Sequence, residues 1–170
     1  GMNWLDSNTI LTSLGSLAVL GAALIIYFET ATILGSFLPG DSLLFLLGLA
    51  LATWLSYFPV YVAIPLLFIA AVAGSQTGFW LGHKLGPRLF KQRETFFFNH
   101  RTVEHTKKFF DRYGARSIVL ARFVPGLRAL IPMFAAISHF DAKRFWKLNL
   151  IGGAAWTVGL TGCGYLLGQV

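Results

Sequence analysis

Charged residues are scarce in this chain. They make up 12% of its 170 residues, whereas a soluble domain carries about 25%. Three stretches hold no Asp, Glu, Lys, Arg or His at all: residues 10–28, 42–82 and 148–170. A helix needs roughly 20 apolar residues to span a bilayer, so the first and last stretches each fit one spanning helix. The middle stretch is too long for one helix and must turn back near Trp54–Pro65, whose aromatic and proline residues predict a membrane–water interface.

Residues for covalent or metal chemistry are equally few. Cys163 is the only cysteine, which excludes an internal disulfide and a thiolate metal site. The four histidines form no pair at ligand spacing, and no G-x-S-x-G nucleophile elbow occurs. We therefore expect no enzyme, no catalytic residue, no metal and no cofactor. An enzyme that acts on lipid phosphates is the main rival class.

The net charge of +7 is concentrated in one segment between the apolar stretches. Residues 84–116 hold nine of the 14 Lys and Arg residues, opposed there only by Glu94, Glu104 and Asp111. Positively charged loops stay on the cytoplasmic side of a membrane, so this linker is predicted to be cytoplasmic. The anionic membrane surface beside the loop is its expected partner, and nucleic acid is not.

Part of this linker has the pattern of an amphipathic helix. Its apolar face holds Val103, Thr106, Phe110 and Tyr113, and its cationic face holds Arg101, His105, Lys108 and Arg112. A helix of this kind lies along the membrane surface. The run Phe96–Phe98 is predicted to help anchor it there.

Two motifs recur at one offset of 86 residues. FLPG at 37–40 returns as FVPG at 123–126, and GFWLG at 78–82 returns as GYLLG at 164–168. Proline lacks a backbone donor and glycine adopts unusual dihedrals, so a Pro-Gly break inside a membrane must be surrounded by protein or by a wet cavity. Corresponding breaks in two halves indicate a transporter's binding site. The alternative is a tight turn between two short helices.

These features predict an all-α polytopic membrane protein with an inverted repeat. We expect one domain over residues 2–170, with repeat 1 at about 28–86, the linker at 87–116 and repeat 2 at about 117–170. Each repeat would combine a re-entrant hairpin with a Gly-rich transmembrane helix. With the N-terminus inside, residues 10–28 would cross outward, 64–82 would return, and the two hairpins would enter from opposite faces. Glycines at every fourth position from 74 to 86 predict close packing, within the chain or in a homodimer.

Four charged residues interrupt the broken segments: Glu29, Asp41, Arg122 and Arg128. An Asp, Lys or Arg costs about 2.5–3.5 kcal/mol at the centre of a spanning helix. The planar fork of arginine suits phosphate, so Arg122 and Arg128 are predicted to clamp one. Carboxylates in low-dielectric surroundings take up protons more readily, so Glu29 and Asp41 are predicted to couple transport to protons or to hold a headgroup. Structural ion pairs and snorkelling to the interface are the alternatives.

Several of these residues resemble the motifs of a known family. Phe28-Glu29 and the segment 37–41 resemble the acidic motif of the DedA family, which belongs to the VTT (SNARE-associated) superfamily. The segment 122–128 is similar to the family's basic signature. Further matches are Tyr113-Gly114, Phe140, Phe145, Asn149, Gly152-Gly153 and Trp156. The resemblance covers roughly residues 25 to 168.

The resemblance implies re-entrant hairpins and lipid translocation across the bacterial inner membrane. Undecaprenyl phosphate is the expected cargo, because a phosphomonoester suits two arginines; phosphatidylethanolamine stays open as an alternative, with Glu29 or Asp41 as partner of its ammonium. A membrane scaffold and an ion channel are the rivals from other classes. Ser75 and His83 stand where the family often has an acidic and a basic residue. Family members usually continue with another hydrophobic helix, so we expect the chain to be truncated before it.

Overall fold

A computed structural model describes residues 7–31, 40–56, 58–85, 100–124 and 127–170. Every regular element in these ranges is a helix, which confirms the all-α prediction. The elements are α1 (Ser7–Ala31), α2 (Gly40–Ala52), α3 (Val60–Leu85), α5 (His100–Tyr113), η3 (Gly114–Arg116), α6 (Ser117–Leu120), η4 (Ala121–Phe123), α7 (Leu127–Ile137) and α8 (Ala142–Gly168). Much of both Pro-Gly motifs, namely Phe37–Pro39 and Pro125-Gly126, lies outside the described residues.

Three of the described helices are long and apolar enough to cross a membrane. They are residues 13–31 of α1, 60–84 of α3 and the whole of α8. α8 has 27 residues and is therefore about 40 Å long. Asp141 starts it by accepting a hydrogen bond from the backbone N–H of Arg144 at 3.2 Å. The turn predicted near Trp54–Pro65 is present between α2 and α3, although Pro65 lies inside α3 rather than in the turn.

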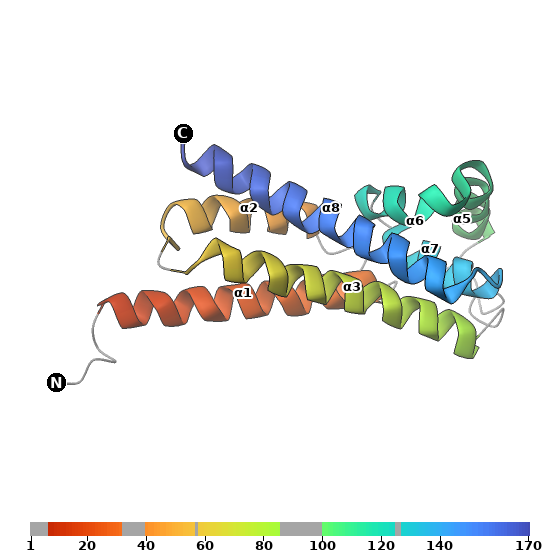
Figure 1. Ribbon diagram of the computed structural model, residues 1–170, viewed down its shortest axis with the longest axis horizontal. Helices are drawn as coiled ribbons and strands as arrows, with labels where there is room; N and C mark the ends of the chain where they lie inside the picture. Colours follow the sequence, from red (N-terminus) through yellow and green to blue (C-terminus); the bar gives the residue numbers. More distant parts are fainter. Residues whose placement is uncertain (1–6, 32–39, 57, 86–99, 125–126) are drawn as a thin grey trace.

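α3 and α8 form an antiparallel pair at the centre of the protein (Figure 1). Phe79 stacks on Phe145 with ring centroids 4.2 Å apart, and further along Gly153 faces Val72. The short helix α2 runs parallel to the C-terminal half of α8, where Gly168 faces Ala52. The other short helix, α7, runs parallel to the C-terminal half of α3. Each short helix therefore packs against the long helix of the other half of the sequence.

α1 runs in the same direction as α3, so the predicted order of crossings is wrong. Gly15 lies beside Phe58, just before α3, and the Tyr27 hydroxyl is hydrogen-bonded at 2.9 Å to the hydroxyl of Thr77, in the C-terminal half of α3. Residues 10–28 therefore do not cross in the direction opposite to residues 64–82. α1 instead leads toward the middle of the bundle, and α2 leads back toward the end at which α1 begins. Hydropathy predicts the length of a helix in a membrane, but it carries no information on its direction.

Glycines permit the closest approaches between these helices. Gly48 of α2 lies against the carbonyl of Thr161, and Gly164 of α8 lies against the carbonyl of Phe45. Gly74 of α3 makes a similar contact with the Thr30 side chain of α1. A β-carbon at any of these positions would collide with its neighbour, so the small residues let the backbones touch. The glycines therefore pack within the chain, and the homodimer stays a prediction.

Two apolar clusters occupy the two ends of the bundle. One cluster gathers buried side chains of α1, α2, the turn after α2, α3 and α8: Val19, Ala22, Ile26, Leu44, Leu47, Ala50, Leu51, Leu55, Ala63, Leu67, Ala71 and Trp156. The other gathers buried residues of α3, α6, η4, α7 and α8: Phe79, Ile118, Ala121, Ile131, Ala135, Ala136 and Phe145. Large apolar side chains also stay exposed along the long helices, as expected of a lipid-facing surface.

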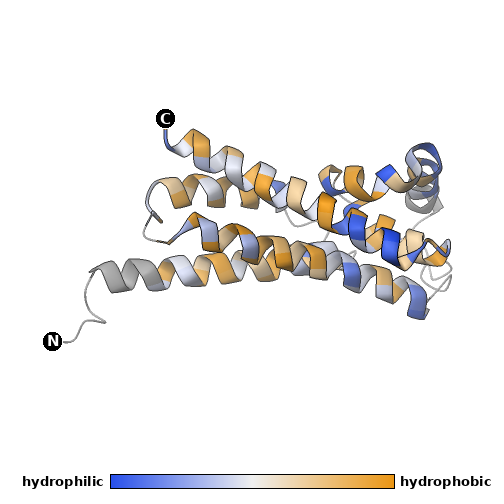
Figure 2. Cartoon of the chain, viewed as in Figure 1, coloured by the Kyte–Doolittle hydropathy of each residue, from blue (hydrophilic) through white to orange (hydrophobic). Residues whose placement is uncertain are grey.

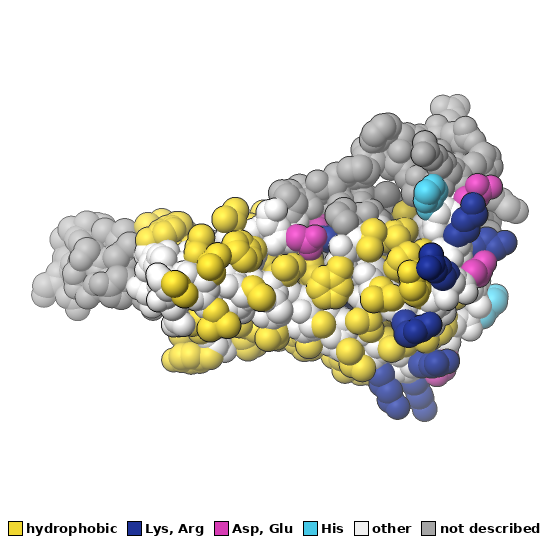
Figure 3. Space-filling view, turned by 90° about the horizontal axis from the view of Figure 1, so that it is seen from above, with side chains coloured by type: hydrophobic (Ala, Val, Ile, Leu, Met, Phe, Trp, Pro, Cys, Tyr) yellow, Lys and Arg dark blue, Asp and Glu magenta, His cyan; other side chains and the backbone are white. Residues whose placement is uncertain are grey.

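Hydrophilic residues gather at one end of the protein. Figure 2 shows this end where α3 finishes and α8 begins, and Figure 3 shows Lys and Arg side chains collected there. The predicted amphipathic helix is present here as α5. Its Phe110 packs against Phe134 and Phe140, so its apolar face contacts α7 and the turn that follows. Phe96–Phe98, the predicted anchor, lies outside the described residues.

Candidate functional site

The four charged residues selected from the sequence lie halfway along the two central helices. Arg122 donates a hydrogen bond to the carbonyl of Ala71, the twelfth of the 26 residues of α3. Asp41 accepts one from Trp156, the fifteenth of the 27 residues of α8. α3 and α8 are long enough to span a bilayer, and ions halfway along a spanning helix must be paired or held by polar groups.

Arg128, the second residue of α7, is paired with two carboxylates. Its Nη1 donates to Glu29 Oε1 at the end of α1, and its Nη2 donates to Asp41 Oδ2 at 3.0 Å at the start of α2. Glu29 and Arg128 are fully buried, whereas the Asp41 side chain is 39% exposed. The ion pairs join the two halves of the sequence. They also make Arg128 the most heavily compensated charge of the site.

Arg122, at the end of the short helical segment before the second break, is held by neutral oxygen atoms. Its Nη1 donates to the Ala71 carbonyl at 3.2 Å, and its Nη2 donates to Asn149 Oδ1. Asn149 in turn donates from Nδ2 to the Val72 carbonyl at 3.0 Å and to Gln76 Oε1 at 3.1 Å. Among the described residues, no carboxylate pairs with Arg122. The hydrogen bonds of this guanidinium therefore go to neutral dipoles and not to a carboxylate.

Trp156 connects the two arginines. Its ring centroid lies 4.9 Å from the guanidinium carbon of Arg128 and 6.0 Å from that of Arg122. Its indole N–H donates to Asp41 Oδ1 at 2.6 Å. A cation over an indole face is attracted to the ring quadrupole, so one fully buried side chain stabilises both guanidinium groups and orients one carboxylate.

Two helix N-termini point into this site. α2 begins at Gly40 and α7 begins at Leu127, and each runs away from the middle of the bundle toward an opposite end. A helix N-terminus carries a partial positive charge, which favours the carboxylates of Glu29 and Asp41 there. Gly40 lies against the Glu29 carboxylate so closely that any side chain would displace it. The glycine of the first Pro-Gly pair is thus required by the ion pair.

The sequence did not predict the uncharged residues of this site. Asn149 and Trp156 belong to the stretch that carries the family resemblance, but no role followed from their positions. Gln76 carried no role either. The only signal for them is that polar side chains occur in otherwise apolar spanning segments, and such residues commonly serve packing as well.

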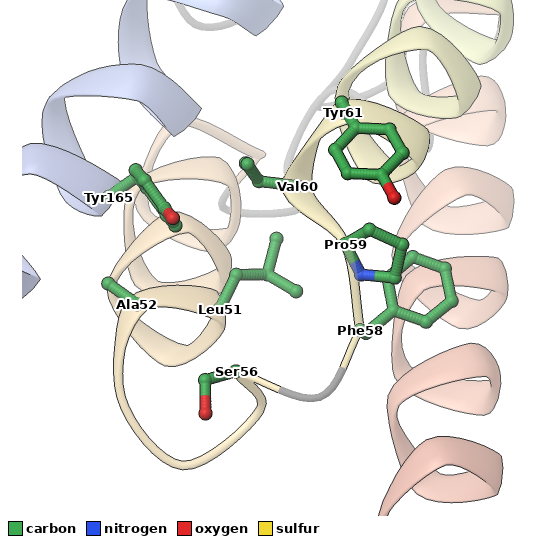
Figure 4. Close-up of a pocket in the computed structure, with 8 residues that line it drawn as sticks. All are labelled: Leu51, Ala52, Ser56, Phe58, Pro59, Val60, Tyr61 and Tyr165. Atoms are coloured by element: carbon green, nitrogen blue, oxygen red, sulfur yellow. The ribbon is translucent and has the colours of Figure 1, made fainter.

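No arrangement in the described ranges suits a metal ion, since no group of three or more His, Cys, Asp or Glu occurs there. A cavity of about 400 Å³ lies away from the charges, between the end of α2, the start of α3 and Tyr165 of α8 (Figure 4). Its lining side chains include Ser56, Tyr61 and Tyr165 but no charged group. The chemistry of the described chain is therefore concentrated at the arginine–carboxylate site.

Fold and site together define a helical membrane protein with paired charges buried halfway along its spanning helices. A family model described as the VTT domain matches residues 38–166. The chain belongs to the DedA family of VTT-domain membrane proteins. This confirms the family predicted from the acidic and basic motifs.

Two of the following three relatives carry names that refer to membranes. The chain is 39% identical over 169 residues to an uncharacterized membrane protein of Mycobacterium tuberculosis, covering 99% of this chain and 73% of the relative. It is 33% identical over 147 residues to protein DedA of Escherichia coli, covering 86% of this chain and 67% of the relative. It is 30% identical over 145 residues to inner membrane protein YqjA of Escherichia coli, covering 85% of this chain and 65% of the relative. No solved structure matches the chain.

Proposed function

We propose that this chain is a lipid transporter of the bacterial inner membrane that moves undecaprenyl phosphate across the bilayer. Arg128 carries the proposal, because a guanidinium buried between two carboxylates at mid-depth is an expensive arrangement for structure alone. Arginine binds phosphate through paired N–H donors. In this proposal a lipid phosphate replaces a carboxylate as the partner of Arg128, with Arg122 as the second cation of the clamp.

The carboxylates supply the proposed coupling to protons. A carboxylate that loses its arginine partner in a low-dielectric site favours the protonated form. Entry of a phosphate would therefore be accompanied by proton uptake at Glu29 or Asp41, and release of the phosphate by proton loss. This makes translocation respond to a pH gradient.

The arrangement of the helices supports an inverted repeat of two re-entrant hairpins. α1 leads from one end of the bundle to its middle, and α2 leads back to that end. The segment from η3 to η4 leads to the middle from the basic end, and α7 leads back to the basic end. The two short helices then point their N-termini at one site from opposite sides. Transporters with such repeats place their substrate at the junction. With the basic end in the cytoplasm, the site would be reached from both faces in turn.

Phosphatidylethanolamine is the second candidate cargo. The half-exposed Asp41 favours it, because a carboxylate within reach of solvent or lipid can accept an ammonium group. A phosphomonoester has no such group and would use the arginines alone. The two lipids therefore differ in what removal of the Asp41 charge should do.

The test is a translocation assay in proteoliposomes. Labelled undecaprenyl phosphate and labelled phosphatidylethanolamine are followed separately, with and without a pH gradient, in wild type and in Arg128→Ala. We expect the phosphomonoester to move in wild type, faster with a gradient, and to stop in the variant. If neither lipid moves, or if the folded variant moves both as fast as wild type, the proposal is wrong and a membrane scaffold becomes the better account.

A further inference from the structure

A groove leads from the outer surface of the protein to the charged site. It has a volume of about 340 Å³ and is lined by Asp41, Ser42, Phe45 and Leu46 of α2 and by Leu160 of α8. Leu46 is 57% exposed, so the groove lies on the apolar surface of the bundle. Asp41 at its polar end bonds both Arg128 and Trp156. The groove thus combines apolar walls with a charged residue, which matches a molecule that has an apolar chain and a polar headgroup.

The position of the groove determines what can fill it. Asp41 is tied to Trp156, which lies at the middle of α8. At that depth the neighbours of a spanning helix are hydrocarbon chains rather than water or headgroups. The occupant must therefore reach the groove through the lipid phase, with a chain against Phe45, Leu46 and Leu160.

Asp41 separates this groove from Arg128. Of the three residues in the ion-pair cluster, only Asp41 has an exposed side chain, while Arg128 and Glu29 are buried beneath it. A phosphate in the groove reaches the guanidinium only after Asp41 moves away. Glu29 can stay in place as the permanent counter-ion, so the two carboxylates have unlike roles. The indole of Trp156 holds Asp41 in its closed position through the hydrogen bond at 2.6 Å.

We propose that this groove is the lateral entrance for a lipid that carries a phosphate headgroup on a hydrocarbon chain, and that Asp41, held by Trp156, closes it. The inference rests on the proposed function and adds the route to the site and the residue that guards it. The lipid chain lies in the groove, and its phosphate replaces the carboxylate of Asp41 on Arg128.

The first experiment blocks the groove without changing any charge. Leu160→Trp fills it from the α8 side, and Ile69→Trp is the matched control, because Ile69 is a 61% exposed apolar residue on α3 outside the groove lining. In proteoliposomes, translocation of undecaprenyl phosphate should fall to the protein-free background in Leu160→Trp and stay at the wild-type rate in Ile69→Trp. Equal rates in both variants and wild type would overturn the entrance while leaving transport itself established.

The second experiment does not depend on transport. A photo-reactive diazirine amino acid, close to leucine in size so that the groove stays open, replaces Leu160 or Ile69, and the vesicles contain phosphatidylcholine with a trace of labelled undecaprenyl phosphate. We expect capture of the phosphate lipid above its share of the bilayer at position 160, and capture in proportion to its share at position 69. Proportional capture at both positions would mean ordinary surrounding lipid and would overturn the proposal.

The third experiment tests the hold of Trp156 on Asp41. Trp156→Phe keeps an aromatic ring beside the arginines and removes the indole donor. When Trp156→Phe is combined with the photo-reactive residue at position 160, the protein should capture more of the labelled phosphate lipid than the parent protein does. The reason is that Asp41 has lost its hydrogen bond to the indole. A purely structural role for Trp156 would lower the capture or leave it unchanged, and either result would overturn the closing role.

Discussion

Arg122 and Arg128 flank the same Pro-Gly pair and contact the same indole ring, yet their surroundings differ in kind. Arg128 is bonded to two carboxylates that come from the first half of the chain. Arg122 is bonded to a backbone carbonyl and an amide oxygen that come from α3 and α8. One guanidinium is therefore held by ions and the other by dipoles.

This difference predicts that the two arginines respond differently to removal of their charge. Deleting one partner of a buried ion pair leaves an uncompensated charge in a low-dielectric site. Deleting a charge that is held by neutral groups leaves only unsatisfied dipoles, which costs less. The following predictions concern the free energy of unfolding in detergent and run from the largest expected effect to the smallest.

Arg128→Gln should lower the free energy of unfolding by about 3–5 kcal/mol, because Glu29 would stay buried without its cation. Denaturant titration of the purified protein measures it. The double variant Glu29→Gln, Arg128→Gln should regain much of the loss, since it removes both charges together. A single variant as stable as wild type, or a double variant no better than the single one, would contradict the account of this ion pair.

Arg122→Gln should cost less, about 1–3 kcal/mol, because only the Ala71 carbonyl and the Asn149 amide lose their donors. The same titration compares it with Arg128→Gln. A loss as large as that of Arg128→Gln would show that Arg122 compensates a charge after all, and the contrast between the two arginines would disappear.

Gln76→Ala should have the smallest effect, about 0.5–1.5 kcal/mol. It leaves one N–H of Asn149 Nδ2 without its acceptor, while the other N–H keeps the Val72 carbonyl at 3.0 Å, so the loss is that of a single neutral hydrogen bond. Thermal unfolding against wild type measures it. A loss comparable to that of Arg122→Gln would mean that the Asn149 network, rather than Arg122 itself, holds this region together.

The contrast also shows what the sequence could predict. The four charged residues of the site follow from their positions beside the repeated Pro-Gly motifs, and the family follows from the resemblance of the acidic and basic motifs. Which carboxylate pairs with which arginine does not follow, because 99 positions separate Glu29 from Arg128 and their contact depends on α1 running parallel to α3. The hydropathy of a segment does not tell in which direction the segment crosses the membrane, so the predicted opposite directions of residues 10–28 and 64–82 are wrong. No role could be predicted for Asn149 and Trp156, because the sequence does not distinguish an uncharged residue that binds a ligand from one that packs against a neighbouring helix.

The central claim is that the arginine–carboxylate site moves lipid rather than merely holding the fold. The most direct test measures translocation of undecaprenyl phosphate in proteoliposomes by the double variant Glu29→Gln, Arg128→Gln, whose neutral pair should preserve the fold. The account predicts a stable protein with translocation at the protein-free background. A stable double variant that transports at the wild-type rate would contradict it and would make the buried ion pair purely structural.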